Sequence, residues 1–118
     1  MSDGSEIRER VFTFACSVVS LHDVLVTRGG SARDLSRQLM RAATSIGANL
    51  EEADAGQSRA DFISKCSISL KEARESLYWL RLLRATNKLD ASNDALIHEC
   101  DRIVAVLTAI VKKTKGAG

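Results

Sequence analysis

Apolar side chains recur at steps of three and four residues along four segments of this chain, and this period most constrains its fold. Each step nearly completes a helical turn, so these side chains gather on one face of an α-helix. The first stripe runs from Ile7 to Leu25, and the last runs from Leu96 to Ile110. The 118 residues include no proline, so only glycine and capping residues interrupt the helices. We predict helices over residues 5–28, 32–55, 59–86 and 91–114.

Turn and capping residues separate the four predicted helices. Gly29-Gly30 ends the first helix, Gly56 closes the second, and Asn87–Asp90 forms the last turn. Ser31 and Ser58 stand at N-cap positions, each with an aspartate three residues later. Because the connections are short, consecutive helices must run antiparallel. The prediction is one all-α domain over residues 1–118, an antiparallel up-down-up-down four-helix bundle.

The composition is typical of a reduced, soluble protein. The formal charge of +2 is too small to indicate a nucleic-acid-binding protein by itself. Cys16, Cys66 and Cys100 are dispersed, which indicates free thiols rather than disulfides or a zinc site. Acidic residues near the N-terminus disfavour a signal peptide, and we expect no membrane-spanning segment. We therefore expect a cytoplasmic protein.

No pattern of catalytic or metal-binding residues is evident. The two histidines, His22 and His98, lack the glutamate three positions earlier that di-metal bundles use. Asp94, His98 and Asp101 share a face that points away from the apolar stripe, which favours a surface cluster over a metal site. There is no glycine-rich phosphate loop, and no serine or cysteine nucleophile has an evident histidine partner. We expect a protein without enzymatic activity, cofactor or bound metal.

Two helices carry apolar side chains beyond those that a core requires. A second stripe runs beside the core stripe of the first helix, and the third helix places three large side chains oblique to its core face. Recurring apolar surface of this kind is typical of a subunit contact. The alternative is a wide core that wraps around the helix edges. The predicted homo-oligomer interface comprises Phe12, Ala15, Val19, Val26, Ile68, Trp79 and Leu82.

Cations gather on the outward faces of the second and third helices. Arginines spaced by four residues on the second helix would neutralise phosphates of RNA or DNA, although a solvated helix face is the simpler interpretation. We do not expect aromatic side chains to interleave with these cations, which disfavours base stacking. The candidate nucleic-acid or partner face comprises Arg33, Arg37, Arg41, Arg74, Arg81, Arg84 and Lys88.

Polar residues border the apolar stripes of the second and third helices. Antiparallel packing would bring these flanks together, and such networks fix register more often than they perform chemistry. On the same side of the second helix, Gly47 would let a neighbouring backbone approach closely. The predicted network comprises Ser45, Asn49, Glu52, Lys65, Ser69 and Glu72.

Residues 41–83 resemble the bacterial four-helix bundle protein family, some of whose members are encoded within intervening sequences of 23S ribosomal RNA genes. The matching pieces are RAATSIGANLEE over 41–52, SxxDF from Ser58, SLKEARE over 69–75 and Trp79-Leu80. The resemblance implies an antiparallel bundle without established enzymatic activity, with relatives that look like ring-shaped homopentamers.

The family is also similar to the accessory variability protein of diversity-generating retroelements, a basic pentameric barrel that works with a reverse transcriptase and nucleic acid. The resemblance therefore implies a homopentameric scaffold or adaptor that docks a protein or nucleoprotein. An RNA- or DNA-binding accessory role is the alternative.

Overall fold

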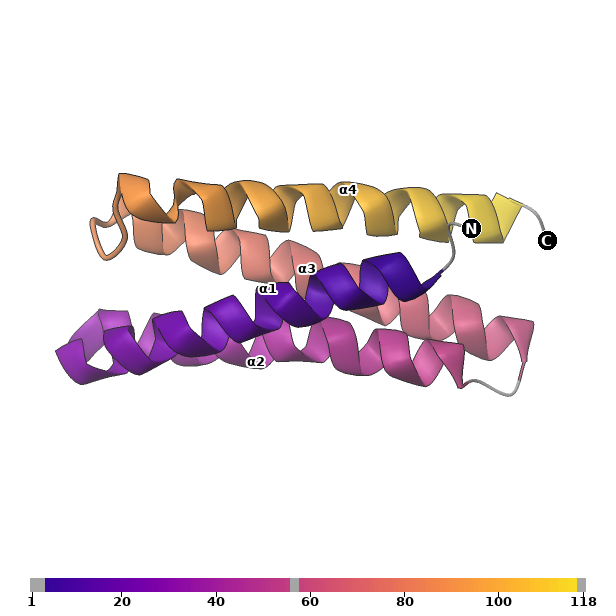
Figure 1. Cartoon of the computed structure of the whole chain (residues 1–118), viewed down its shortest axis with the longest axis horizontal. Helices are drawn as coiled ribbons and strands as arrows, with labels where there is room; N and C mark the ends of the chain where they lie inside the picture. Colours follow the sequence, from indigo (N-terminus) through magenta and orange to yellow (C-terminus); the bar gives the residue numbers. More distant parts are fainter. Residues whose placement is uncertain (1–3, 56–57, 117–118) are drawn as a thin grey trace.

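Four long helices make up the computed structural model, which describes residues 4–55 and 58–116. Figure 1 shows them lying lengthwise in a rod of 46 × 22 × 21 Å, with the chain reversing direction at each connection. The predicted all-α four-helix bundle is confirmed. The helices are α1 (Gly4–Leu25), α2 (Gly30–Asp54), α3 (Arg59–Ala85) and α4 (Asp94–Gly116), with short 3-10 turns η1 (Val26–Arg28) and η2 (Ala91–Asn93).

The four helices are not equally packed. The contact between α2 and α3 is the most extensive, and the contact between α1 and α4 is the least extensive. Within the described residues, the backbones of α1 and α3 do not approach each other closely, and neither do those of α2 and α4, so each of these pairs is diagonally opposed. The first and last helices thus meet along the weakest side of the bundle.

The core is built from the predicted apolar stripes. In α1, for example, Val11 and Val18 are completely buried and Phe14 is almost so. Leu21, Leu77 and Ile110 lie at the edge of the core and are half-buried. Buried residues that the stripes did not include extend the core toward the helix edges and into the turn before η2: Ala32, Ala43, Leu83, Leu89 and Val111.

The start of α2 differs from the prediction. The helix begins at Gly30 with Gly29 as its N-cap, and no side chain caps it. The N-cap role of Ser31 was therefore wrong, because a 3-10 turn ends α1 early and the chain re-enters a helix directly after Gly29. Gly29 has φ 70° and Gly30 has φ 56°, and these left-handed conformations explain the two glycines.

The start of α3 follows the prediction. The Ser58 hydroxyl accepts a hydrogen bond from the backbone N–H of Asp61 at 3.1 Å, so Ser58 is the N-cap. The predicted helix end at Gly56 lies outside the described residues. At the other end of α3, Asn87 has φ 63° and leads the chain toward α4.

The first helix is more apolar overall than we expected. By length and hydropathy alone the stretch Glu6–Arg28 is apolar enough to cross a membrane, as are core helices of some soluble proteins. Phe12, Val19 and Val24 contribute to this because they add exposed apolar surface to a helix whose core stripe is already apolar. The expectation that no segment spans a membrane stays a prediction.

Candidate interaction surfaces

The outward face of α1 carries an apolar stripe. Phe12 is 65% exposed and Val19 is 37% exposed, and the step of seven residues from one to the other brings their side chains to within about 20° around the helix. Ala15 and Val26 extend the stripe and are half-buried. Val24 is 52% exposed but lies about 120° around the helix from Phe12, outside the stripe. Exposure of Phe12 is the most pronounced departure from a polar outer surface.

On α3 the candidate interface residues share one side of the helix by their spacing, and Trp79 also packs against the edge of the core. Ile68 is 37% exposed, and Trp79 and Leu82 are half-buried. The indole Nε1 of Trp79 donates to Oε2 of Glu75 at 3.1 Å, which fixes the ring one turn from the carboxylate. Tyr78 packs edge-to-face on Trp79 with ring centroids 5.2 Å apart and stays 56% exposed. The sequence analysis missed this exposed tyrosine.

Two of the three arginines on α2 are already paired with carboxylates. Arg33 lies 3.4 Å from Asp34. Arg41 reaches across to α3, where it forms a short ion pair with Glu75 and lies 3.9 Å from Oε1 of Glu72. An arginine engaged in this way must give up its carboxylate to bind a phosphate, so the α2 face is less available to nucleic acid than we expected.

Three other members of the predicted basic face differ in whether a carboxylate engages them. Arg84 donates to Asp94 at 2.8 Å, and this hydrogen bond lowers the pKa of the Asp94 carboxyl. The ammonium of Lys88 donates to the carbonyl of Thr86 at 3.2 Å. Arg37 is exposed and forms no ion pair within the described residues.

A basic stripe runs along the outer face of α3, and Arg74 and Arg81 of the predicted basic face belong to it. Lys71, Arg74, Tyr78 and Arg81 follow one another at steps of three and four residues, and all four are exposed. Tyr78 therefore stands between two arginines on one helix face. The expectation that no aromatic side chain interleaves with the cations was wrong, because helical spacing places Tyr78 one turn from each of the two arginines.

The predicted polar residues join α2 to α3 at three points. The buried hydroxyl of Ser69 donates to the carbonyl of Ile46 at 2.8 Å. Lys65 lies 4.0 Å from Glu52, and Glu72 reaches α2 through the ion pair described above. Ser69 is the buried member of this set, and its hydrogen bond fixes the register of the two helices.

Two further members of the predicted network do not cross between helices. Ser45 donates to the carbonyl of Arg41 at 2.9 Å, and Asn49 donates to the carbonyl of Ser45 at 2.8 Å. Both hydrogen bonds stay within α2, because short polar side chains readily bond to a carbonyl one turn earlier.

A histidine and a serine pair between α1 and α2. Nδ1 of His22 lies 2.7 Å from Oγ of Ser36. This hydrogen bond was not predicted from the sequence. Ser36 is completely buried, however, so its hydroxyl has no access to a substrate. The pair acts as a structural hydrogen bond rather than as a nucleophile and base.

The seam between α1 and α4 is held by one charged pair. Nε and Nη2 of Arg10 each donate to an oxygen of Glu99 at 3.0 Å. These hydrogen bonds lower the pKa of Glu99 and raise that of Arg10. The pair closes part of a side of the bundle that apolar packing covers only incompletely.

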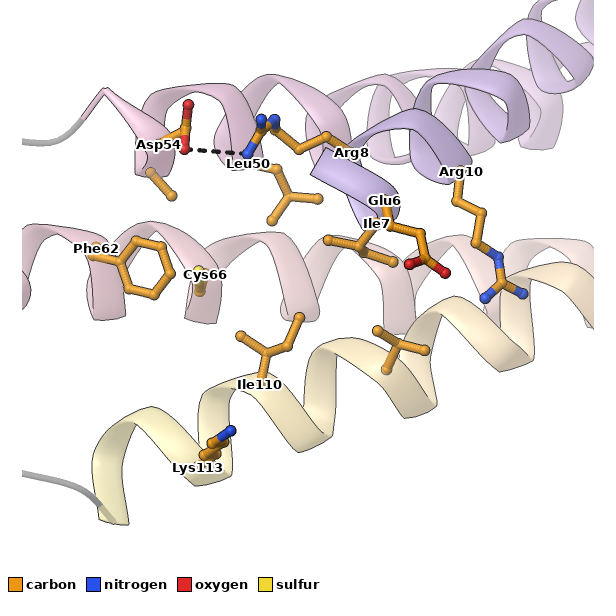
Figure 2. Close-up of a pocket in the computed structure, with 12 residues that line it drawn as sticks. Glu6, Ile7, Arg8, Arg10, Leu50, Asp54, Phe62, Cys66, Ile110 and Lys113 are labelled. Carbon is orange, nitrogen blue, oxygen red and sulfur yellow. Dashed lines mark ion pairs between the residues drawn. The ribbon is translucent and has the colours of Figure 1, made fainter. Parts of the chain in front are cut away.

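A hollow of about 520 Å³ lies beside this pair, where α1 begins and α4 ends. Figure 2 shows apolar side chains between the helices and charged groups around them. Arg8 at this rim is paired with Asp54 at 3.1 Å. The charged groups are thus largely neutralised in pairs, and the hollow holds no set of converging donors that would define a reaction. Its apolar lining is Ile7, Leu50, Ala53, Phe62, Cys66, Val106 and Ile110.

The three cysteines lie in different environments. Cys16 is exposed on α1, next to the stripe that contains Phe12. Cys66 and Cys100 are buried, and burial raises the pKa of both thiols, to about 12 for Cys100. Thiols of this kind stay protonated and unreactive near neutral pH. Across the described part of the chain, no three His, Cys, Asp or Glu side chains converge to hold a metal ion.

Comparison with known proteins places this arrangement in a family. The sequence profile of the 23S rRNA-intervening sequence proteins matches residues 5–109, which includes all of α2 and α3 and most of α1 and α4. The chain belongs to the 23S rRNA-intervening sequence protein family. Its likeness to the four-helix bundle family on the residues 41–83 is thereby confirmed over a longer stretch.

A crystal structure of a similar protein supports the assignment. A Bacteroides thetaiotaomicron protein of unknown function from the S23 ribosomal protein family is 37% identical, with a TM-score of 0.84. The similarity covers 92% of this chain and 97% of the Bacteroides chain. Comparison with curated proteins gave no match. The fold of this 23S rRNA-intervening sequence protein is therefore shared over almost its full length.

Proposed function

We propose that this 23S rRNA-intervening sequence protein is a non-enzymatic, homo-oligomeric scaffold in the cytoplasm. The observation that carries the proposal is the exposure of Phe12 on an apolar stripe of α1. A side chain of this size has 65% of its surface in contact with water in the isolated chain, and its neighbour Val19 is also exposed. Burial of such a stripe against another copy recovers apolar surface at about 25 cal/mol per Å².

The positions of the two apolar surfaces favour a ring over a two-fold dimer. The stripe lies on α1, and the candidate interface residues Ile68, Trp79 and Leu82 lie on α3, which is diagonally opposed to α1. A two-fold contact buries the same patch on both copies, whereas a contact between α1 of one copy and α3 of the next leads to a ring if the rotation closes. We propose five copies, as the family resemblance implies.

The residues available for chemistry support a scaffold rather than an enzyme. His22 is engaged with the buried Ser36, and His98 is exposed on the outer face of α4. The buried thiols are protonated, as their raised pKa values require. A nucleophile paired with an accessible base is the usual minimum for covalent catalysis, and the described residues do not bring one together.

Light scattering coupled to size-exclusion chromatography tests the assembly. We expect the wild-type protein to elute at about five times the chain mass of 12.8 kDa. Phe12→Asp places a charge in the stripe and should yield monomers at micromolar concentration. Val24→Asp is the matched control, since it adds the same charge to an exposed valine outside the stripe. A monomeric wild type, or equal effects of the two substitutions, would refute the proposal.

A further inference from the structure

The basic stripe on α3 combines cations with an aromatic ring. Lys71, Arg74 and Arg81 place three cations on one exposed helix face, with Tyr78 between the two arginines. At 1.5 Å per residue, the stripe is about 15 Å long. No carboxylate interrupts it, because the acidic residues of this part of α3 lie on the flank toward α2.

The three cations are not engaged in ion pairs. Among residues 4–55 and 58–116, the arginines at 33, 41 and 84 are paired with carboxylates, but Lys71, Arg74 and Arg81 are not. A phosphate that approaches this stripe therefore displaces no native carboxylate. The charge is available even though the chain as a whole carries only +2.

The tyrosine ring is held in place and remains accessible. Its edge-to-face contact with Trp79 has an interplanar angle of 72°, and Trp79 is itself fixed by its hydrogen bond to Glu75. Despite this contact, Tyr78 is 56% exposed. A ring that is oriented before binding stacks on a base at a smaller entropic cost than a freely rotating one.

From this juxtaposition we infer that the α3 stripe binds single-stranded nucleic acid, with phosphates on Lys71, Arg74 and Arg81 and a base stacked on Tyr78. A duplex satisfies the cations but keeps its bases stacked inside, so it leaves Tyr78 without a partner. An unpaired strand satisfies both, which is the usual basis of sequence-tolerant single-strand binding. This inference requires that the proposed assembly leave the stripe exposed: a subunit packed on Trp79 must not cover the neighbouring Tyr78 ring.

Fluorescence anisotropy with a labelled 20-nucleotide RNA of mixed sequence tests the inference. We expect tighter binding of the single strand than of the same RNA annealed to its complement. Tyr78→Ala should weaken single-strand binding by about 5- to 150-fold, the range found when a stacking side chain is removed. Tyr78→Phe should restore it, since phenylalanine keeps the aromatic face. Equal binding by Tyr78→Ala and the wild type would overturn the proposal.

The cations are tested through the salt dependence. The double variant Arg74→Ala/Arg81→Ala should reduce the slope of log affinity against log salt by about 0.7 for each lost phosphate contact. Arg102→Ala is the matched control, because Arg102 is an exposed arginine on α4, outside the stripe. An equal loss in the control and the double variant would overturn the proposed site. Light scattering on each variant shows whether a loss of RNA binding comes from a change in assembly. A Tyr78→Ala variant that binds RNA weakly only because its oligomer dissociates would also overturn the proposed site.

Discussion

Arg10 and Glu99 clamp the first helix to the last through two hydrogen bonds of 3.0 Å each. They lie on the side of the bundle where helix contact is least extensive, so the pair replaces part of the missing apolar packing. About a third of each side chain is exposed, at 31% and 32%, which weakens the electrostatic attraction relative to a buried pair.

A double-mutant cycle should detect this clamp. We expect Arg10→Ala and Glu99→Ala to show a coupling free energy of up to about 1 kcal/mol in urea unfolding, the upper end for partly solvated pairs. Arg84 and Asp94 offer a comparison, since their side chains are more exposed, at 38% and 56%. A coupling near zero for Arg10 and Glu99 would show that the clamp does not contribute to stability.

The same pair gives a pH dependence with a defined sign. Hydrogen bonding from Arg10 lowers the pKa of Glu99 in the folded state, so the carboxylate stabilises the fold above the ordinary glutamate pKa of about 4.3. This contribution is lost as the pH falls through the lowered value. We expect the stability advantage of the wild type over Glu99→Gln to be constant near neutrality and to shrink during acid titration. An advantage that grows on acidification would contradict this assignment.

Thiol labelling should report on the proposed assembly. Cys16 lies four residues after Phe12 and three before Val19, so a subunit packed on that stripe should cover it. We expect slow alkylation of Cys16 by iodoacetamide in the wild-type protein and fast alkylation in the Phe12→Asp variant, followed by mass spectrometry. Cys66 and Cys100 should react in neither until the protein is unfolded. Fast labelling of Cys16 in an intact oligomer would place the interface elsewhere.

Substitution by alanine should change the stability of the fold in opposite directions at Gly47 and Gly29. A Cβ at Gly47 would lie 3.4 Å from Cγ1 of Val11, an ordinary contact, so Gly47→Ala should stabilise the fold by up to about 1 kcal/mol through helix propensity. A Cβ at Gly29 meets nothing within 4 Å, but φ is 70° there, so Gly29→Ala should destabilise by about 1 kcal/mol or more. Thermal unfolding of both variants measures the difference in sign.

The buried serines of α3 should also differ. Ser69 donates to α2 at Ile46, whereas Ser76 donates to the carbonyl of Glu72 in its own helix. We expect Ser69→Ala to cost about 1 kcal/mol and Ser76→Ala to cost less, because the second hydrogen bond is local and adds nothing between helices. Equal costs in urea unfolding would mean that the inter-helix hydrogen bond does not fix the pairing of α2 and α3.

The helical period was sufficient to predict the fold because it directly encodes which face is buried. Val11, Phe14 and Val18 follow from spacing alone, and all are buried. The beginning of α2 was not predictable in the same way. Ser31 and Asp34 form a good capping sequence, but the left-handed Gly29-Gly30 pair re-enters the helix earlier, and backbone conformations of glycine leave no periodic signal.

The candidate surfaces were harder to predict than the core. A helical wheel places Arg41 on an outer face but does not show that Glu72 and Glu75 of another helix lie beside it. A helical wheel also does not show that His22 of α1 lies beside Ser36 of α2, since the two residues belong to different helices. Tyr78 is different, because the spacing of Arg74, Tyr78 and Arg81 alone places the ring between the two arginines on one helix face.

The unequal helix contacts have a kinetic consequence. The most extensive contact joins α2 to α3, which follow each other directly along the chain, so this hairpin forms with little loop-closure entropy. The seam between α1 and α4 joins the two most distant helices in sequence and is the weakest. We expect the hairpin to order first, with amides in its buried turns exchanging most slowly with deuterium, while α1 docks late and opens early.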